Sequence, residues 1–137
     1  MYVRCVKLKI EKLLTDYLVG LKFEEIPLTV VEATKAQVLN IISVMLGGSS
    51  ASGIKDLVGL LKDWGGKPES TVIAYGDKIP APHAAQANAS MAHALDFDDT
   101  YGYDLTTKKK GDGGHANASI IPAAFAASEL SERVGGK

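Results

Sequence analysis

The sequence predicts a mainly α-helical fold, with about five helices and one short β-hairpin. Apolar residues recur at spacings of three and four along three separate stretches, 10–21, 31–45 and 54–64. This spacing is the period of a helix that buries one face. The pattern changes between Thr71 and Ile79, where β-branched residues flank a Gly-Asp pair and favour a short hairpin.

The first two helices follow directly from the spacing. An amphipathic helix is expected from Ile10 to Leu21. A second is expected to open with a capping box, in which Thr29 is the N-cap and Glu32 lies three residues later. It is expected to stop at Gly47–Gly48. Its inward-facing residues are expected to be Val31, Val38, Ile41, Ile42 and Met45.

Three further helices complete the predicted fold. The buried stripe of the third is expected to be Ile54, Leu57, Val58, Leu61 and Trp64. A fourth helix is expected to begin near Pro82, with proline at its first position, and to be alanine-rich from His83 to Leu95. A fifth is expected over 119–133, with Pro122 in its first turn. The segment between them, 101–114, is rich in glycine and lysine and is expected to be a loop.

Composition restricts the class of function. The 137 residues suffice for one domain, and a net charge of -1 indicates no nucleic-acid or membrane-surface partner. No uninterrupted apolar run approaches the roughly 20 residues of a membrane span. The single cysteine, Cys5, cannot form an internal disulfide and is expected to be a structural thiol. A reducing compartment, the cytoplasm, is therefore expected.

The stretch Ala89 to Thr100 concentrates the groups that can carry chemistry. If the fourth helix continues through it, His93, Asp96 and Thr100 fall on one stripe with Asp99 beside them. Asp98 would then point elsewhere. So many carboxylates at a helix C-terminus oppose the helix dipole, and sequences break such local rules mostly at functional sites.

Two other interpretations of these aspartates are weaker. Asp96, Asp98 and Thr100 match the D-x-D-x-T motif of haloacid-dehalogenase-type phosphatases, but that motif follows a strand rather than an alanine-rich helix. The aspartates could also join His93 and His115 around a divalent cation. No H-x-x-x-H or E-x-x-H spacing supports this, so no metal is predicted. A solvated helix end remains the non-functional alternative.

The histidines differ in what they suggest. His83 has no visible partner in the sequence and is expected to be structural. His115 lies alone in a glycine-rich segment immediately before a helix. It could be a surface residue, or it could be brought to the aspartates from another element.

The same region carries a resemblance to a known family. The segment A-H-A-L-D-F-D-D-T, with its flanking sequence, resembles the MmgE/PrpD family, which holds 2-methylcitrate dehydratase, cis-aconitate decarboxylase and iminodisuccinate epimerase. The similarity extends upstream over nearly the whole chain. The residues that carry it are 79–88, 92–100, His115 and 121–124.

This resemblance implies a helical domain that full-length members join to a second, α+β domain, with the active site between the two and a homodimeric assembly. Residues 1–137 are therefore expected to be a partial helical domain, a truncated N-terminal part. By motif, Asp96, Thr100 and His115 fall on the family's active-site positions.

The resemblance also implies chemistry without a cofactor. The expected function is that of a 2-methylcitrate dehydratase-like lyase of propionate metabolism, acting on a small di- or tricarboxylic acid. Asp96, buried beside Asp99, would transfer the proton, Thr100 would bond the substrate, and His115 would be the partner acid or base. The residues expected to contact substrate are His93, Asn88 and Asp99.

Alternatives within the family are decarboxylation and epimerisation. Outside it, the alternative is a non-catalytic helical module that acts by association. The 137-residue chain by itself is expected to be inactive, because the family's cationic and further catalytic residues lie outside it. A homo-oligomer is expected.

Overall fold

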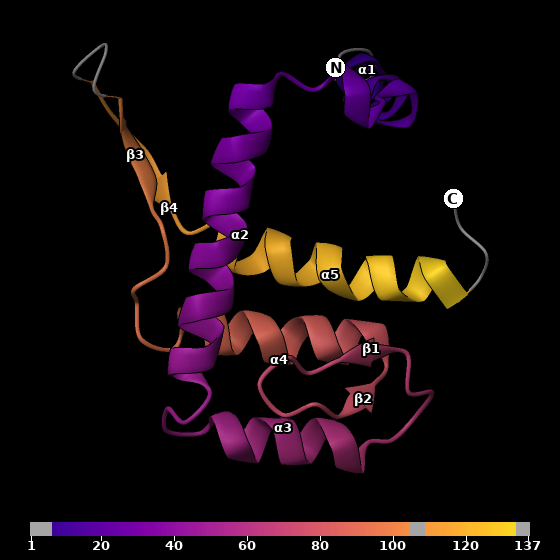
Figure 1. Cartoon of the computed structure of the whole chain (residues 1–137), viewed down its shortest axis with the longest axis vertical. Helices are drawn as coiled ribbons and strands as arrows, with labels where there is room; N and C mark the ends of the chain where they lie inside the picture. Colours follow the sequence, from indigo (N-terminus) through magenta and orange to yellow (C-terminus); the bar gives the residue numbers. More distant parts are fainter. Residues whose placement is uncertain (1–6, 105–108, 134–137) are drawn as a thin grey trace, which may run out of the picture. The chain divides into compact units, whose positions relative to one another are not determined.

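A computed structural model of the chain describes residues 7–104 and 109–133. Within these ranges the chain forms five α-helices, one short 3-10 helix and two pairs of strands (Figure 1). The prediction of a mainly helical fold is confirmed. The chain divides into two units, residues 1–35 and residues 36–137. Cys5 lies outside the described residues.

The first unit holds α1 (Lys7–Gly20), the 3-10 helix η1 (Phe23–Glu25) and the start of α2 (Leu28–Gly48). The predicted amphipathic helix is therefore present as α1. Its apolar stripe is nevertheless exposed, with Leu13 69% and Tyr17 62% accessible.

The predicted capping box at the start of α2 is wrong. The helix begins at Leu28, and the amides of Val30 and Val31 donate hydrogen bonds to the carbonyl of Pro27. A residue whose carbonyl accepts the first helical bonds occupies the N-cap. Glu32 pairs instead with Lys35 at 2.8 Å along the helix surface.

Helix α2 has the length and composition of a candidate membrane span. The mean hydropathy of its 18-residue window is 1.3, and 11% of that window is buried. The core helix of a soluble protein passes the same test, and Ile41 and Met45 of α2 are completely buried. The absence of a membrane partner stays a prediction from the sequence.

The core of the second unit forms around α4 (Ala81–His93), which lies between α3 (Ile54–Asp63) and α5 (Asn117–Arg133) (Figure 1). Small side chains let these helices approach closely. Ala84 and Ala87 of α4 are completely buried. The last residue of α2, Gly48, packs against the backbone near the end of α4.

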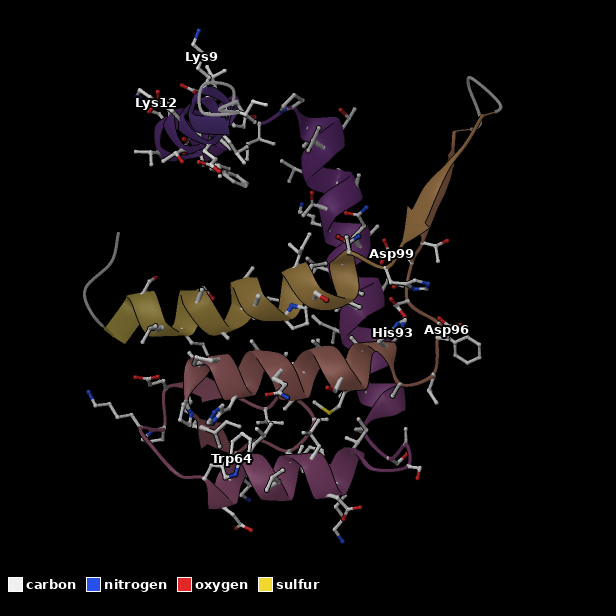
Figure 2. All side chains as sticks on the ribbon, turned by 180° about the vertical axis from the view of Figure 1, so that it is seen from behind. Lys9, Lys12, Trp64, His93, Asp96 and Asp99 are labelled. Carbon is white, nitrogen blue, oxygen red and sulfur yellow. The ribbon has the colours of Figure 1, made fainter. Side chains whose placement is uncertain are left out.

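The third helix matches its predicted stripe except at the end. Ile54, Val58 and Leu61 are buried, but Trp64 is 62% exposed. The helix stops at Asp63, so Trp64 is its C-cap and lies at the end of α3 (Figure 2). Its ring lies 5.5 Å from the ring of His83, measured between centroids.

Two short antiparallel ladders accompany the helices. Strands β1 (Ser70–Thr71) and β2 (Lys78–Ile79) confirm the predicted hairpin, in a shortened form. Strands β3 (Tyr101–Asp104) and β4 (Lys109–Gly114) pair where a loop was predicted, so that prediction is wrong. Backbone pairing needs no apolar side chain, so a glycine- and lysine-rich strand gives no hydrophobic period.

The last two helices differ from the prediction at one end each. Helix α4 runs from Ala81 to His93, so it begins beside Pro82 as predicted but ends before Leu95. Helix α5 begins at Asn117 rather than Ser119. Pro122 therefore lies inside α5, beyond its first turn. It is among the completely buried side chains.

Glu129 ties α5 to the first hairpin. Its carboxylate accepts bonds from the amide and hydroxyl of Thr71, both at 2.9 Å, and from the ammonium of Lys78 at 2.6 Å. Burial opposes ionisation of this carboxyl, but the bonds from Lys78 and Thr71 outweigh it and hold the pKa of Glu129 below its ordinary range.

A lowered carboxyl pKa makes stability depend on pH. The contribution of Glu129 is present above the ordinary glutamate pKa and is lost as pH falls through the lowered value, because the unfolded chain binds the proton first. We expect Glu129→Gln to reduce the free energy of unfolding by about 1 kcal/mol at neutral pH. Urea unfolding of both proteins should show this gap closing as pH falls below the ordinary range of a glutamate carboxyl. Glu32→Gln is the control and should leave no such pH-dependent difference.

Candidate functional site

The fourth helix ends before the aspartates. The amide of Asp96 donates to the carbonyl of His93, and Asp96 adopts a left-handed backbone with φ of 55°. Aspartate is one of the few residues that tolerate this conformation. The predicted helical stripe of His93, Asp96 and Thr100 is therefore wrong, because residues 94–100 are not helical.

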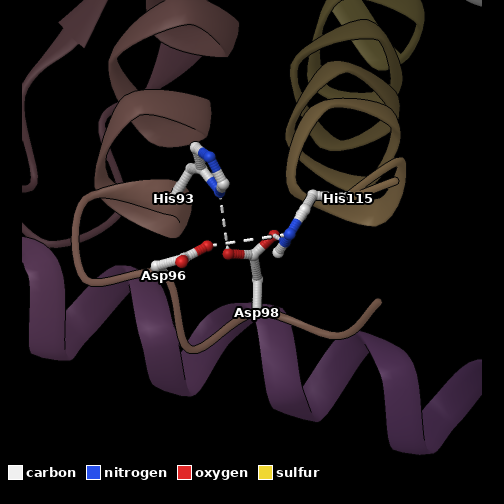
Figure 3. A group of neighbouring side chains, drawn as sticks. All are labelled: His93, Asp96, Asp98 and His115. Atoms are coloured by element: carbon white, nitrogen blue, oxygen red, sulfur yellow. Dashed lines mark hydrogen bonds and ion pairs between the residues drawn. The ribbon is translucent and has the colours of Figure 1, made fainter. Parts of the chain in front are cut away.

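Asp98 is the centre of the site (Figure 3). Its side chain is completely buried, with Oδ1 2.9 Å from Nδ1 of His93 and Oδ2 2.8 Å from Nδ1 of His115. The prediction that Asp98 points elsewhere is wrong. An ionised carboxylate can only accept hydrogen bonds, so each imidazole can bond it only with a proton on Nδ1.

His115 and Asp96 converge as the sequence predicts. Nε2 of His115 lies 3.6 Å from Oδ1 of Asp96. Strand pairing explains this approach, because Gly114 lies opposite Tyr101 and so returns the chain to the segment it left. The expected burial of Asp96 is wrong, since its side chain is 77% exposed. Figure 2 shows it in the segment that follows His93.

The electrostatics of the group centre on Asp98. The hydrogen bond and the negative charge of Asp98 raise the pKa of His93, with a smaller contribution from Asp96. Burial opposes ionisation of Asp98, but the bonds from His93 and His115 outweigh it and lower the pKa of this carboxyl. The site therefore favours an ionised carboxylate beside a protonated imidazole.

The other predicted site residues lie differently. Thr100 is exposed, and no side-chain bond joins it to this group within the described ranges. Asn88 is buried and its amide bonds the backbone of Ile73 and Thr71. Asp99 accepts a 2.6 Å bond from Asn117, and its other oxygen is buried without a partner. Their assignment to substrate stays a prediction.

An open pocket of about 370 Å³ lies beside the two histidines. Helix α4 lines it with residues from its last turns, and α5 with residues from its first turn. The lining residues are Ala89, Ser90, His93, His115, Ala118 and Ser119. The N-terminus of a helix carries partial positive charge and exposed amides, so this end of α5 favours an anion.

The same four side chains are the group that could hold a cation. His93, Asp96, Asp98 and His115 each offer one donor atom, and these atoms lie within 4.8 Å of one another. In the present arrangement both oxygens of Asp98 are already bonded to imidazoles. A cation would have to replace those bonds rather than fill an unsatisfied cage.

We therefore expect no stabilisation by divalent cations. A ligand that binds only the folded state raises the thermal midpoint. Thermal unfolding of the purified chain in a chelator, in Mn²⁺ and in Zn²⁺ should give the same midpoint. A rise with either ion that disappears in His115→Gln would contradict the prediction of no metal.

The comparison with protein families identifies the domain that holds this group. The model of the MmgE/PrpD N-terminal domain matches residues 12–137, a range that includes the whole group around Asp98. No curated protein and no solved structure matches the chain. The match covers most of the 137 residues, and the chain therefore belongs to the MmgE/PrpD family through its N-terminal domain.

Proposed function

We propose that this domain supplies the acid–base groups of a cofactor-independent lyase that acts on a small di- or tricarboxylate. Dehydration of 2-methylcitrate is our first choice of reaction. The observation that carries the proposal is the pair of imidazoles fixed by one buried carboxylate at the edge of an open pocket. General acid–base catalysis needs such groups within hydrogen-bond reach of the substrate.

In this proposal the two proton transfers have separate carriers. Asp96 accepts the proton from the carbon beside a substrate carboxylate, and the electron pair of that C–H bond forms the new double bond. His115 donates a proton from Nε2 to the hydroxyl on the neighbouring carbon, which leaves as water. Asp96 lies 3.6 Å from that nitrogen, so the proton can return to the histidine afterwards.

The pocket supports a carboxylate as the ligand. The hydrogen bond and charge of Asp98 raise the pKa of His93, which favours its positively charged form, and His93 lines the pocket together with His115. Ser90 and Ser119 line the pocket too, and serine hydroxyls can donate hydrogen bonds. We propose that a substrate carboxylate is held here, between the end of α4 and the start of α5.

The alternative function is association without chemistry. The observation that favours it is the exposed apolar surface of the helices, including Leu39 and Leu46 on α2, which are 66% and 53% exposed. Large exposed apolar patches mark interaction sites. A pure association module would not need a buried carboxylate between two histidines.

The test is turnover by two proteins, the isolated 137-residue chain and the same chain continued by an α+β domain of the family. Both are incubated with 2-methylcitrate, cis-aconitate and iminodisuccinate. We expect only the continued chain to react, because a substrate with several carboxylates needs more cationic groups than His93 and His115 provide. Absence of any reaction in the continued, folded protein would favour the association module.

We also propose that the chain forms a homo-oligomer. Exposed apolar side chains gain about 25 cal/mol per Å² when they are removed from water. We expect sedimentation at micromolar concentration to show species larger than a monomer. A replacement of Leu39 and Leu46 by glutamine should shift them toward monomer, and a wild-type chain that sediments as a single monomer would contradict the proposal.

A further inference from the structure

We propose that Asp98 is a positioning residue that holds the ring protons of both His93 and His115 on Nδ1. Nε2 is then the nitrogen through which each ring gains or loses a proton. This inference rests on the proposed function for its purpose, but its evidence is the hydrogen-bond geometry. Asp98 is not among the residues that line the pocket, and the side-chain hydrogen bonds that it makes within the described residues go to these two histidines.

The geometry determines the tautomers. The two oxygens of Asp98 face one ring nitrogen each, at 2.9 Å and 2.8 Å, and the side chain is inaccessible to water. An ionised carboxylate has no proton to donate, so each Nδ1 must carry one. When either ring is neutral, its lone pair is therefore on Nε2.

No other described group competes for Nδ1. The segment 94–100 contributes Asp96, which faces Nε2 of His115, and Asp99, which is bonded to Asn117. From α4 and from the start of α5, the charged groups at the site are His93 and His115 themselves. Asp98 is therefore the residue that sets the orientation of both rings.

The arrangement links two histidines from different elements into one unit. Their ring centroids lie 4.8 Å apart at an angle of 64°. The shared carboxylate therefore leaves Nε2 of each ring for proton exchange, and removal of water requires both a proton donor and a proton acceptor.

The sequence offers a contrast within the same chain. The third histidine, His83, packs against Trp64, and its Nδ1 is buried without a hydrogen-bond partner. Its tautomer is thus not set by a carboxylate. His83 serves as an internal reference for the two rings at the site.

The experiment is a measurement of the ring nitrogens by ¹H–¹⁵N NMR on the isolated chain, with no substrate present. The three histidines are assigned with His83→Gln, His93→Gln and His115→Gln. Above the pH at which the rings become neutral, we expect His93 and His115 to hold the proton on Nδ1, with Nε2 unprotonated. A neutral ring of either residue with its proton on Nε2 would overturn the proposal.

Replacement of the carboxylate gives the second arm. In Asp98→Asn the amide oxygen accepts from one ring, but the amide nitrogen donates to the other, which must move its proton to Nε2. We expect that switch in one of the two rings, and none in Asp77→Asn, the matched control outside the site. Unchanged tautomers in folded Asp98→Asn would overturn the proposal, and the wild-type spectrum decides alone if this variant does not fold.

The readout separates this inference from the lyase proposal. If both rings of the isolated chain carry the proton on Nδ1 but the chain joined to the second domain shows no turnover, the positioning role stands and the proposed reaction is wrong. In an active continued protein, Asp98→Asn should lower kcat by about 100-fold or more and change KM much less. A loss confined to KM would assign Asp98 to binding and overturn the positioning role.

Discussion

Replacing Gly48 by alanine should reduce the free energy of unfolding by about 3 kcal/mol, the upper end of the usual cost of an overpacked site. An added Cβ would overlap the carbonyl oxygen of Met91 and lie 3.2 Å from its carbonyl carbon and 3.3 Å from Cβ of Ala94. The first two atoms belong to the backbone of α4, which cannot move aside as a side chain can. The close approach of Gly48 also fixes the position of the end of α4, the helix that ends at His93.

The adjacent glycine provides a matched control. A Cβ on Gly47 would meet only Cδ1 of Leu95, at an ordinary 3.8 Å. Alanine is the better helix former by about 0.5–1 kcal/mol, so Gly47→Ala should be neutral or stabilising. Urea unfolding of the two variants measures the difference. Equal stability of Gly48→Ala and Gly47→Ala would mean that α2 and α4 are not packed as described.

The largest effect on activity is expected at His115. In a protein in which the chain is continued by the second domain of the family, His115→Gln should lower turnover of 2-methylcitrate by about 10²–10⁴-fold, the usual contribution of a general acid or base. Glutamine keeps a side chain that can form hydrogen bonds but cannot be protonated near neutral pH. The start of α5 and the pocket should therefore remain folded.

His83→Gln is the control for this substitution. His83 lies against Trp64 and has no contact with Asp98, so its replacement should leave turnover within a small factor of the wild type. The measurement is kcat and KM for the three proteins, together with their thermal midpoints. Equal activity of His115→Gln and the wild type would remove His115 from the proposed chemistry.

The helices could be predicted from sequence because their signal is periodic. Ile41 and Met45 on α2 and Val58 and Leu61 on α3 are buried as their spacing predicts. Element ends were less predictable, since Pro27 rather than Thr29 caps α2. The pairing of 101–104 with 109–114 had no periodic signal, because it depends on backbone hydrogen bonds.

The central residue of the site could not be predicted from helical geometry. No glycine or proline lies between His93 and Thr100 to indicate that the helix ends there. The helix ends at His93, and the left-handed conformation of Asp96 then turns the chain so that Asp98 lies between the two histidines. His115 was singled out by the resemblance, but the strand pairing that brings it back could not be predicted from spacing.

The central claim is that the groups gathered around Asp98 move a proton at a carbon beside a carboxylate. Solvent-deuterium exchange tests this most directly, because it detects the C–H step even when no product accumulates. The continued protein is incubated with 2-methylcitrate in D₂O, and the substrate is followed by ¹H NMR. We predict incorporation of deuterium beside the carboxylate in the wild type and its loss in Asp96→Asn. Incorporation at an equal rate in wild type and Asp96→Asn, or none in an otherwise active protein, would contradict the account.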